Sequence, residues 1–194
     1  MAKPKVALIG EGNVGTAIRN GLERSGYEAK SVGHNPEQIR KTASWGDVIF
    51  LAVPFTALDD TIRELGDSID GKTVVDVTNA LTHDLQLATG INTSGAEELQ
   101  KKVPKAKVVK SFNTVFAKNM ETGKVKNTPI SLFTAGDDSE AKDRVLKMGR
   151  DIGFDPVDVG PLRNARWLET LGYLNIQLGY SQKMGTNIGF KLVH

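Results

Sequence analysis

Cysteine is absent from the 194 residues of this sequence, and histidine occurs only three times. Without cysteine the chain forms no disulfide, no thiolate nucleophile and no iron–sulfur cluster. The histidines, His34, His83 and His194, do not have the spacing of metal ligands. We therefore expect no metal site.

The sequence also lacks a strong charge of either sign and any long apolar run. Its 25 basic and 23 acidic side chains leave a net charge of +2, which gives no indication of a nucleic-acid or membrane partner. No apolar run approaches the roughly 20 residues that span a bilayer. The N-terminal residues do not resemble a signal peptide, so we expect a cytoplasmic protein.

Short apolar runs alternate instead with amphipathic stretches along the chain. This alternation predicts an α/β fold of the Rossmann type, with a doubly wound, mostly parallel sheet and a C-terminal helical tail. We expect a dinucleotide-binding domain over 1–160 and a tail over 161–194 that packs on the same domain. The predicted strands are 6–9, 28–32, 47–53, 73–77, 107–112, 130–134 and 154–159, and the predicted helices are 14–24, 36–44, 55–65, 96–102, 137–152 and 164–183, with a long loop over 81–95.

A glycine motif lies between the first predicted strand and the first predicted helix. It reads Gly10-Glu11-Gly12-Asn13-Val14-Gly15 and matches the dinucleotide-binding pattern G-x-G-x-x-G in the required context. Gly10 permits a tight turn, Gly12 lets the backbone approach a pyrophosphate, and Gly15 lets helix and strand pack closely. The motif predicts that residues 10–15 bind a nicotinamide dinucleotide at the helix N-terminus.

The end of the second predicted strand bears on the choice between NADP and NAD. NAD enzymes place an acidic residue there, whereas this chain has Gly33, His34 and Asn35. His34 and Asn35 can donate hydrogen bonds to a 2′-phosphate, and Arg40 and Lys41 follow nearby. We therefore expect NADP, with NAD not excluded.

Three further predicted strands end in small or amide-bearing residues, at Val53-Pro54, Asn79-Ala80 and Asn113. Ligands of open α/β sheets bind beyond the carboxyl ends of the strands. These residues are therefore candidates for contacts with the nicotinamide and its ribose.

The sequence offers no obvious proton donor for carbonyl reduction. No tyrosine is followed by a lysine four residues later, and His83 is the only histidine near the predicted cleft, which makes it a weak catalytic candidate. Hydride transfer to a flavin or deazaflavin needs mainly the positioning of two rings. Three functions stay open: hydride transfer between NADPH and such an acceptor, reduction of a small carbonyl or imine with His83 as acid, and non-catalytic sensing of NADP.

The glycine motif, the strand ends Val53-Pro54, 75–79 and 112–114, and the tails 160–169 and 184–192 together resemble the NADP oxidoreductases that depend on coenzyme F-420, a deazaflavin. The cytosolic domain of the STEAP metalloreductases is similar as well. The resemblance implies a homodimer that binds NADP at the glycine motif and at residues 33–35, with a small-molecule redox acceptor stacked on the nicotinamide. Archaeal members carry Ser-Arg after the second-strand glycine, where this chain has His34-Asn35.

The predicted C-terminal helix contains charged and apolar residues at helical spacing. Arg166 and Glu169 are three positions apart, and we expect them to pair on the helix surface. Trp167, Leu171 and Leu174 are expected to pack in the core or in a dimer contact.

Overall fold

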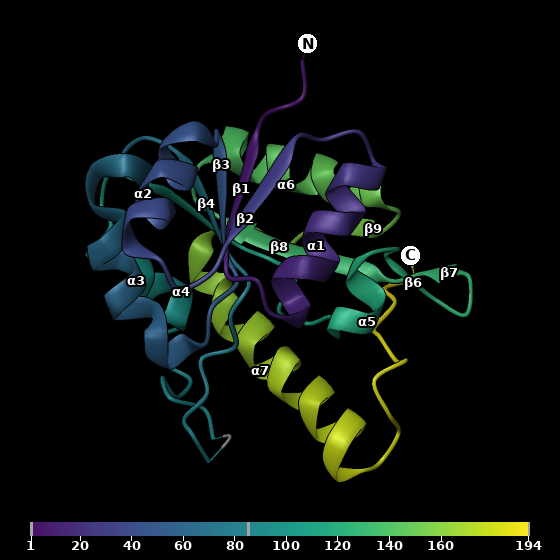
Figure 1. Cartoon of the computed structure of the whole chain (residues 1–194). Coiled ribbons are helices and arrows are strands. Elements are labelled where there is room, and N and C mark those ends of the chain that lie inside the picture. Colours follow the sequence, from purple (N-terminus) through teal and green to yellow (C-terminus); the bar gives the residue numbers. More distant parts are fainter. Residues whose placement is uncertain (1, 85, 194) are drawn as a thin grey trace.

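The computed structural model describes residues 2–84 and 86–193. Within them a seven-stranded sheet carries helices on both faces (Figure 1). The C-terminal His194 and one residue of the predicted loop, Leu85, lie outside the described residues, as does Met1. None of the described helices combines the length and apolar character that a membrane crossing requires.

The strand order in the sheet is β2-β1-β3-β4-β5-β8-β9. All neighbours pair in parallel except β5 and β8, which are antiparallel, so the predicted mostly parallel Rossmann-type sheet is confirmed. The chain adds β2 on one side of β1 and β3 on the other, so the order of the strands reverses at β1. Folds of this type bind their ligands at such a reversal. The strands are β1 Val6–Ile9, β2 Ala29–Val32, β3 Val48–Leu51, β4 Thr73–Asp76, β5 Lys107–Lys110, β8 Ser131–Gly136 and β9 Asp155–Asp158.

Helices α1, α5 and α6 cover one face of the sheet, and α2, α3 and α4 cover the other. Side chains of β1 alternate between these two layers: Leu8 packs with Ile18 of α1, whereas Ile9 packs with Ile39 of α2. Burial on both faces explains why the strands read as continuous apolar runs. The helices are α1 Asn13–Arg24, α2 Pro36–Trp45, α3 Leu58–Leu65, α4 Gly95–Lys102, α5 Ala117–Met120, α6 Ser139–Ile152 and α7 Ala165–Ile176, with 3₁₀ turns η1 Phe55–Ala57, η2 Gly66–Ile69 and η3 Leu162–Asn164.

Helix α7 passes below the carboxyl ends of the strands in Figure 1, at the edge where ligands of this fold bind. The helix predicted over 164–183 is α-helical only to Ile176 and continues as a π-helical turn, η4, over Gln177–Ser181. Trp167 and Leu174 are 63% and 47% exposed, so they lie outside the core. The short α5 and the hairpin of β6 Lys124–Val125 and β7 Thr128–Pro129 were not predicted, because elements of two to four residues carry no hydrophobic period.

Candidate functional site

The glycine motif forms the turn from β1 into α1, beside the end of β3. Gly10 has a φ of +118°, and a Cβ on it would lie 2.2 Å from the carbonyl oxygen of Ala52. A Cβ on Gly15 would lie 2.1 Å from the carbonyl oxygen of Gly10. These two glycines are therefore required by the close approach of the protein's own backbone segments.

For Gly12, by contrast, no contact within the protein requires a glycine. Its φ of −71° suits any residue, and a Cβ on it would meet no atom within 4 Å. It is the exposed N-cap of α1, and no side chain caps this helix end. A pyrophosphate lying against the first amides of α1 would need this open space, so the loop fits a dinucleotide.

A cavity of about 500 Å³, which we call the glycine-loop pocket, opens beside Gly12 between α1, α5 and the C-terminal segment. The rings of Phe116 and Tyr180 meet edge to face there, with centroids 5.6 Å apart. A Cβ on Gly179 would lie 2.5 Å from Cζ of Phe116, so the π-helical turn η4 packs directly on that ring. The lining residues are Glu11, Gly12, Asn13, Thr16, Ala17, Asn20, Phe116, Ala117, Lys118, Glu121, Tyr180 and Thr186.

The residues predicted to meet a 2′-phosphate lie in the turn after β2. His34 and Asn35 are both exposed, and the Asn35 side chain caps α2 by accepting a hydrogen bond from the amide of Gln38 at 3.0 Å. Arg40, which we expected to add positive charge here, forms an ion pair with Asp67. The positive charge available to this turn is therefore smaller than the sequence suggested.

The predicted residues at the other strand ends come together below β4 and β5. The Asn113 amide donates to Oδ1 of Asn79 at 3.2 Å and to the carbonyl oxygen of Leu168 at 2.8 Å, and the Asn79 amide donates to the carbonyl oxygen of Asn113 at 3.2 Å. A Cβ on Gly172 of α7 would lie 2.4 Å from Oδ1 of Asn79. The Asn113 amide thus holds α7 against the sheet edge, and Asn79 contacts both Asn113 and the site of Gly172. Val53 and Pro54 lie between β3 and η1, next to Ala52 under Gly10.

A buried charge cluster lies at this edge, formed by Lys110 of β5, Asp76 of β4 and Glu169 of α7. The Lys110 ammonium is fully buried and donates to Asp76 at 2.9 Å and to the carbonyl oxygen of Thr78 at 2.6 Å, and it lies 3.1 Å from Oε1 of Glu169. Burial disfavours its charge, but the two carboxylates outweigh that effect and hold the pKa of Lys110 above its ordinary value. All three protons of the ammonium have an acceptor, as a buried charge requires.

Glu169 joins this cluster to the N-terminus of α4. Its two carboxylate oxygens accept the amides of Gly95 at 2.9 Å and Ala96 at 3.2 Å. The carboxylate thereby satisfies orphan amides of α4 and binds α7 to both the sheet and α4.

The expected surface pair of Arg166 and Glu169 is wrong, because the two side chains leave α7 in different directions. Arg166 forms two hydrogen bonds to Glu97 of α4, at 2.8 and 2.7 Å, while Glu169 is 3% exposed. The hydrogen bonds from the Arg166 guanidinium hold the pKa of the Glu97 carboxyl below its usual range. Charged residues inside apolar runs, such as Lys110 in a buried strand, are the sequence signal for such a cluster.

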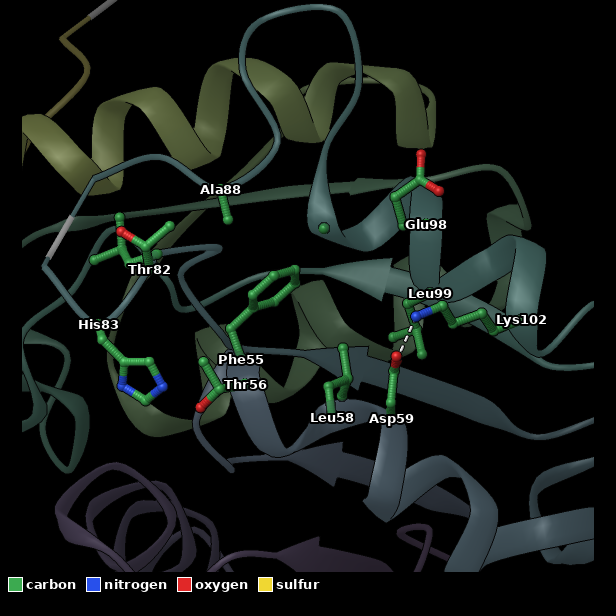
Figure 2. Close-up of a pocket in the computed structure, with 12 residues that line it drawn as sticks. Phe55, Thr56, Leu58, Asp59, Thr82, His83, Ala88, Glu98, Leu99 and Lys102 are labelled. Atoms are coloured by element: carbon green, nitrogen blue, oxygen red, sulfur yellow. Dashed lines mark hydrogen bonds and ion pairs between the residues drawn. The ribbon is translucent and has the colours of Figure 1, made fainter.

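His83 lines a second cavity of about 340 Å³, between η1, α3, α4 and the loop after β4 (Figure 2). Phe55 lies in its middle, and the ion pair of Lys102 with Asp59 lies at the end opposite His83. Its lining contains no residue of the glycine motif. The structure therefore places His83 in a different pocket from the one beside Gly12.

Comparison with known proteins agrees with this geometry. The family model described as "NADP oxidoreductase coenzyme F420-dependent" matches residues 5–80, which include the glycine motif. The F420-dependent NADP reductase of Methanocaldococcus jannaschii is 29% identical over 182 residues, which cover 86% of this chain and 76% of that protein. The chain is therefore similar to NADP oxidoreductases that depend on coenzyme F420, and the similarity includes the glycine motif.

Two further comparisons also extend beyond residue 80, one with a curated protein and one with a solved structure. The metalloreductase STEAP3 of Rattus norvegicus is 31% identical over 182 residues, which cover 87% of this chain but only 36% of that protein. The chain thus spans about a third of the length of the curated metalloreductase. A protein of Arthrobacter sp. FB24, provisionally named an F420-dependent NADP reductase, has the same fold, with a TM-score of 0.90, 24% identity and coverage of 98% of this chain and 100% of that one.

Proposed function

We propose that this protein is an oxidoreductase that transfers hydride between NADP(H) and a flavin or deazaflavin, which binds in the glycine-loop pocket. The observation that carries the proposal is Gly12. No contact within the fold requires a glycine at this position, and Gly12 lines this pocket directly. The names of the relatives support NADP and a deazaflavin acceptor. In this proposal the dinucleotide contacts come from Gly10, Glu11, Gly12, Asn13, Val14, Gly15, His34, Asn35, Val53, Pro54, Asn79, Ala80 and Asn113.

The roles of the protein's own groups follow from their positions. The first amides of α1 hold the pyrophosphate, and the space over Gly12 lets it approach them. Phe116 and Tyr180 provide an aromatic wall against which a planar ring stacks, and they keep water from one side of it. When bound, NADPH supplies a hydride to the acceptor ring, which takes one proton from water, and NADP⁺ remains.

The alternative reaction, reduction of a small carbonyl or imine with His83 as the acid, has less support. A proton donor must come within hydrogen-bond reach of the reacting atom. His83 lines a pocket that contains no glycine-motif residue, whereas the aromatic wall adjoins Gly12 directly.

Stopped-flow mixing of the enzyme with NADPH and either FMN or the deazaflavin tests the proposal. We expect NADPH oxidation to match acceptor reduction one to one. Replacing Tyr180 by Ala should lower the second-order rate constant for acceptor reduction about two- to tenfold, because an aromatic contact contributes about 0.5–1.5 kcal/mol. Tyr180→Phe keeps the ring and should retain the rate, and His83→Ala should leave it unchanged.

Two outcomes would contradict the proposal. Loss of turnover in His83→Ala, with a small carbonyl substrate as the acceptor, would support the alternative reductase. Tight NADPH binding without turnover on any acceptor would instead support a sensing module.

A further inference from the structure

The carboxylate of Glu11 lies over the end of β2, although Glu11 itself belongs to the glycine motif. The Ser31 hydroxyl donates to Oε1 of Glu11 at 3.2 Å. Oε2 lies 3.1 Å from the point where a Cβ on Gly33 would stand. Ser31 in turn accepts a hydrogen bond from Arg19 of α1 at 3.1 Å, so the carboxylate is oriented through a chain of two hydrogen bonds.

This is the place where a dinucleotide-binding fold recognises the ribose of adenosine. An acidic group at the end of the second strand accepts hydrogen bonds from the ribose hydroxyls of NAD, whereas NADP needs positive charge for its 2′-phosphate. The main chain after β2 supplies no acid, because it continues through Gly33, His34 and Asn35. Glu11 brings a carboxylate to the same place from the neighbouring loop.

The charges around Glu11 do not neutralise it. Among residues 2–84 and 86–193, no basic side chain lies within 4.0 Å of its carboxylate. Arg19 contacts it only through Ser31 and lies 3.9 Å from Glu23, and Arg40 pairs with Asp67. A 2′-phosphate at this point would therefore meet an uncompensated negative charge.

We propose that Glu11 is a specificity-determining residue that lets this protein bind NADH as well as NADPH. Its carboxylate accepts a hydrogen bond from the 2′-hydroxyl of NADH and repels the 2′-phosphate of NADPH. This inference rests on the proposed dinucleotide site, and it assigns the choice of dinucleotide to the glycine motif and not only to the turn at residues 33–35.

Calorimetric titration of the whole chain with NADH and with NADPH tests the inference. In the unmodified protein we expect the two dissociation constants to lie within about tenfold of each other. Glu11→Gln keeps the shape of the side chain and removes its charge, so it should shift the ratio about tenfold or more toward NADPH, equivalent to about 1.4 kcal/mol. Glu28→Gln makes the same charge change before the start of β2, at its opposite end, and should leave the ratio unchanged.

The outcomes separate this inference from the proposed function. Binding of both dinucleotides with the same ratio in the unmodified protein and Glu11→Gln would overturn the role of Glu11 and leave the site intact. A preference for NADPH above about a hundredfold in the unmodified protein would also overturn it. If neither dinucleotide binds to protein that gives a normal thermal unfolding transition, the dinucleotide site itself is refuted.

Discussion

Replacing Lys110 by methionine removes the cation that two buried carboxylates share. Methionine has a similar length and fits an apolar environment, so the substitution changes charge more than volume. Asp76 keeps its hydrogen bond from the amide of Thr78, and Glu169 keeps those from Gly95 and Ala96. Neither carboxylate keeps a positive partner, because Lys110 is the only cation that contacts either of them within the described residues.

The expected loss of unfolding free energy is about 3–5 kcal/mol, the usual cost of removing one partner from a buried ion pair. This is a large share of the roughly 5–15 kcal/mol that stabilises a typical domain. The matched control is Lys105→Met, which removes a lysine from an ion pair at the surface. The Lys105 side chain is 75% exposed and lies 2.8 Å from Asp70, so its removal should cost far less than the removal of Lys110.

Urea unfolding at neutral pH, followed by circular dichroism, measures both losses. In the unmodified protein the raised pKa of Lys110 keeps its contribution complete at neutral pH, and the contribution is lost only as pH rises through that pKa. Equal losses of unfolding free energy in Lys110→Met and Lys105→Met would refute the role of the buried charge cluster in binding α7 to the sheet.

Three further predictions concern the glycine loop and the contact between α7 and α4. Gly15→Ala should lower the unfolding free energy by about 1–3 kcal/mol in a urea titration, because its Cβ would collide with the carbonyl of Gly10. Arg166→Met should lower the urea midpoint in the same assay, since it removes both hydrogen bonds from the guanidinium and leaves the Glu97 carboxylate with the one from the Ser94 hydroxyl; an unchanged midpoint would contradict this. The lowered pKa of Glu97 contributes stability that is present above its unfolded pKa and lost as pH falls through the folded value. Glu97→Gln should therefore flatten the acid side of the stability–pH profile.

The α/β fold class and the glycine loop followed from local features of the sequence. Val6–Ile9 is apolar throughout because both faces of β1 are buried, and Gly10 and Gly15 mark close backbone contacts that the structure contains. Such features depend on neighbouring residues, so periodicity and a short motif are enough to predict them.

The contacts across the sheet edge could not be predicted in the same way. Lys110 and Glu169 are 59 positions apart, and only the folded topology brings α7 to the end of β5. The same holds for Arg166, whose partner Glu97 lies on another helix, and for the Glu11 carboxylate, whose direction depends on the place of β2 beside β1. A helical spacing of three residues suggested a pair of Arg166 with Glu169, but each side chain has its partners on other elements: Arg166 on α4, and Glu169 on β5 and at the start of α4.

The most direct test of the central claim, a dinucleotide held at the glycine loop, is calorimetric titration of NADPH into the unmodified protein and Gly12→Ala. The new Cβ would meet no protein atom within 4 Å, so the unfolding free energy should change by less than about 1 kcal/mol, the scale of an N-cap substitution. The same methyl group would occupy the space that the pyrophosphate needs, so the dissociation constant should rise about tenfold or more. Unchanged NADPH affinity in a stably folded Gly12→Ala protein would contradict the account.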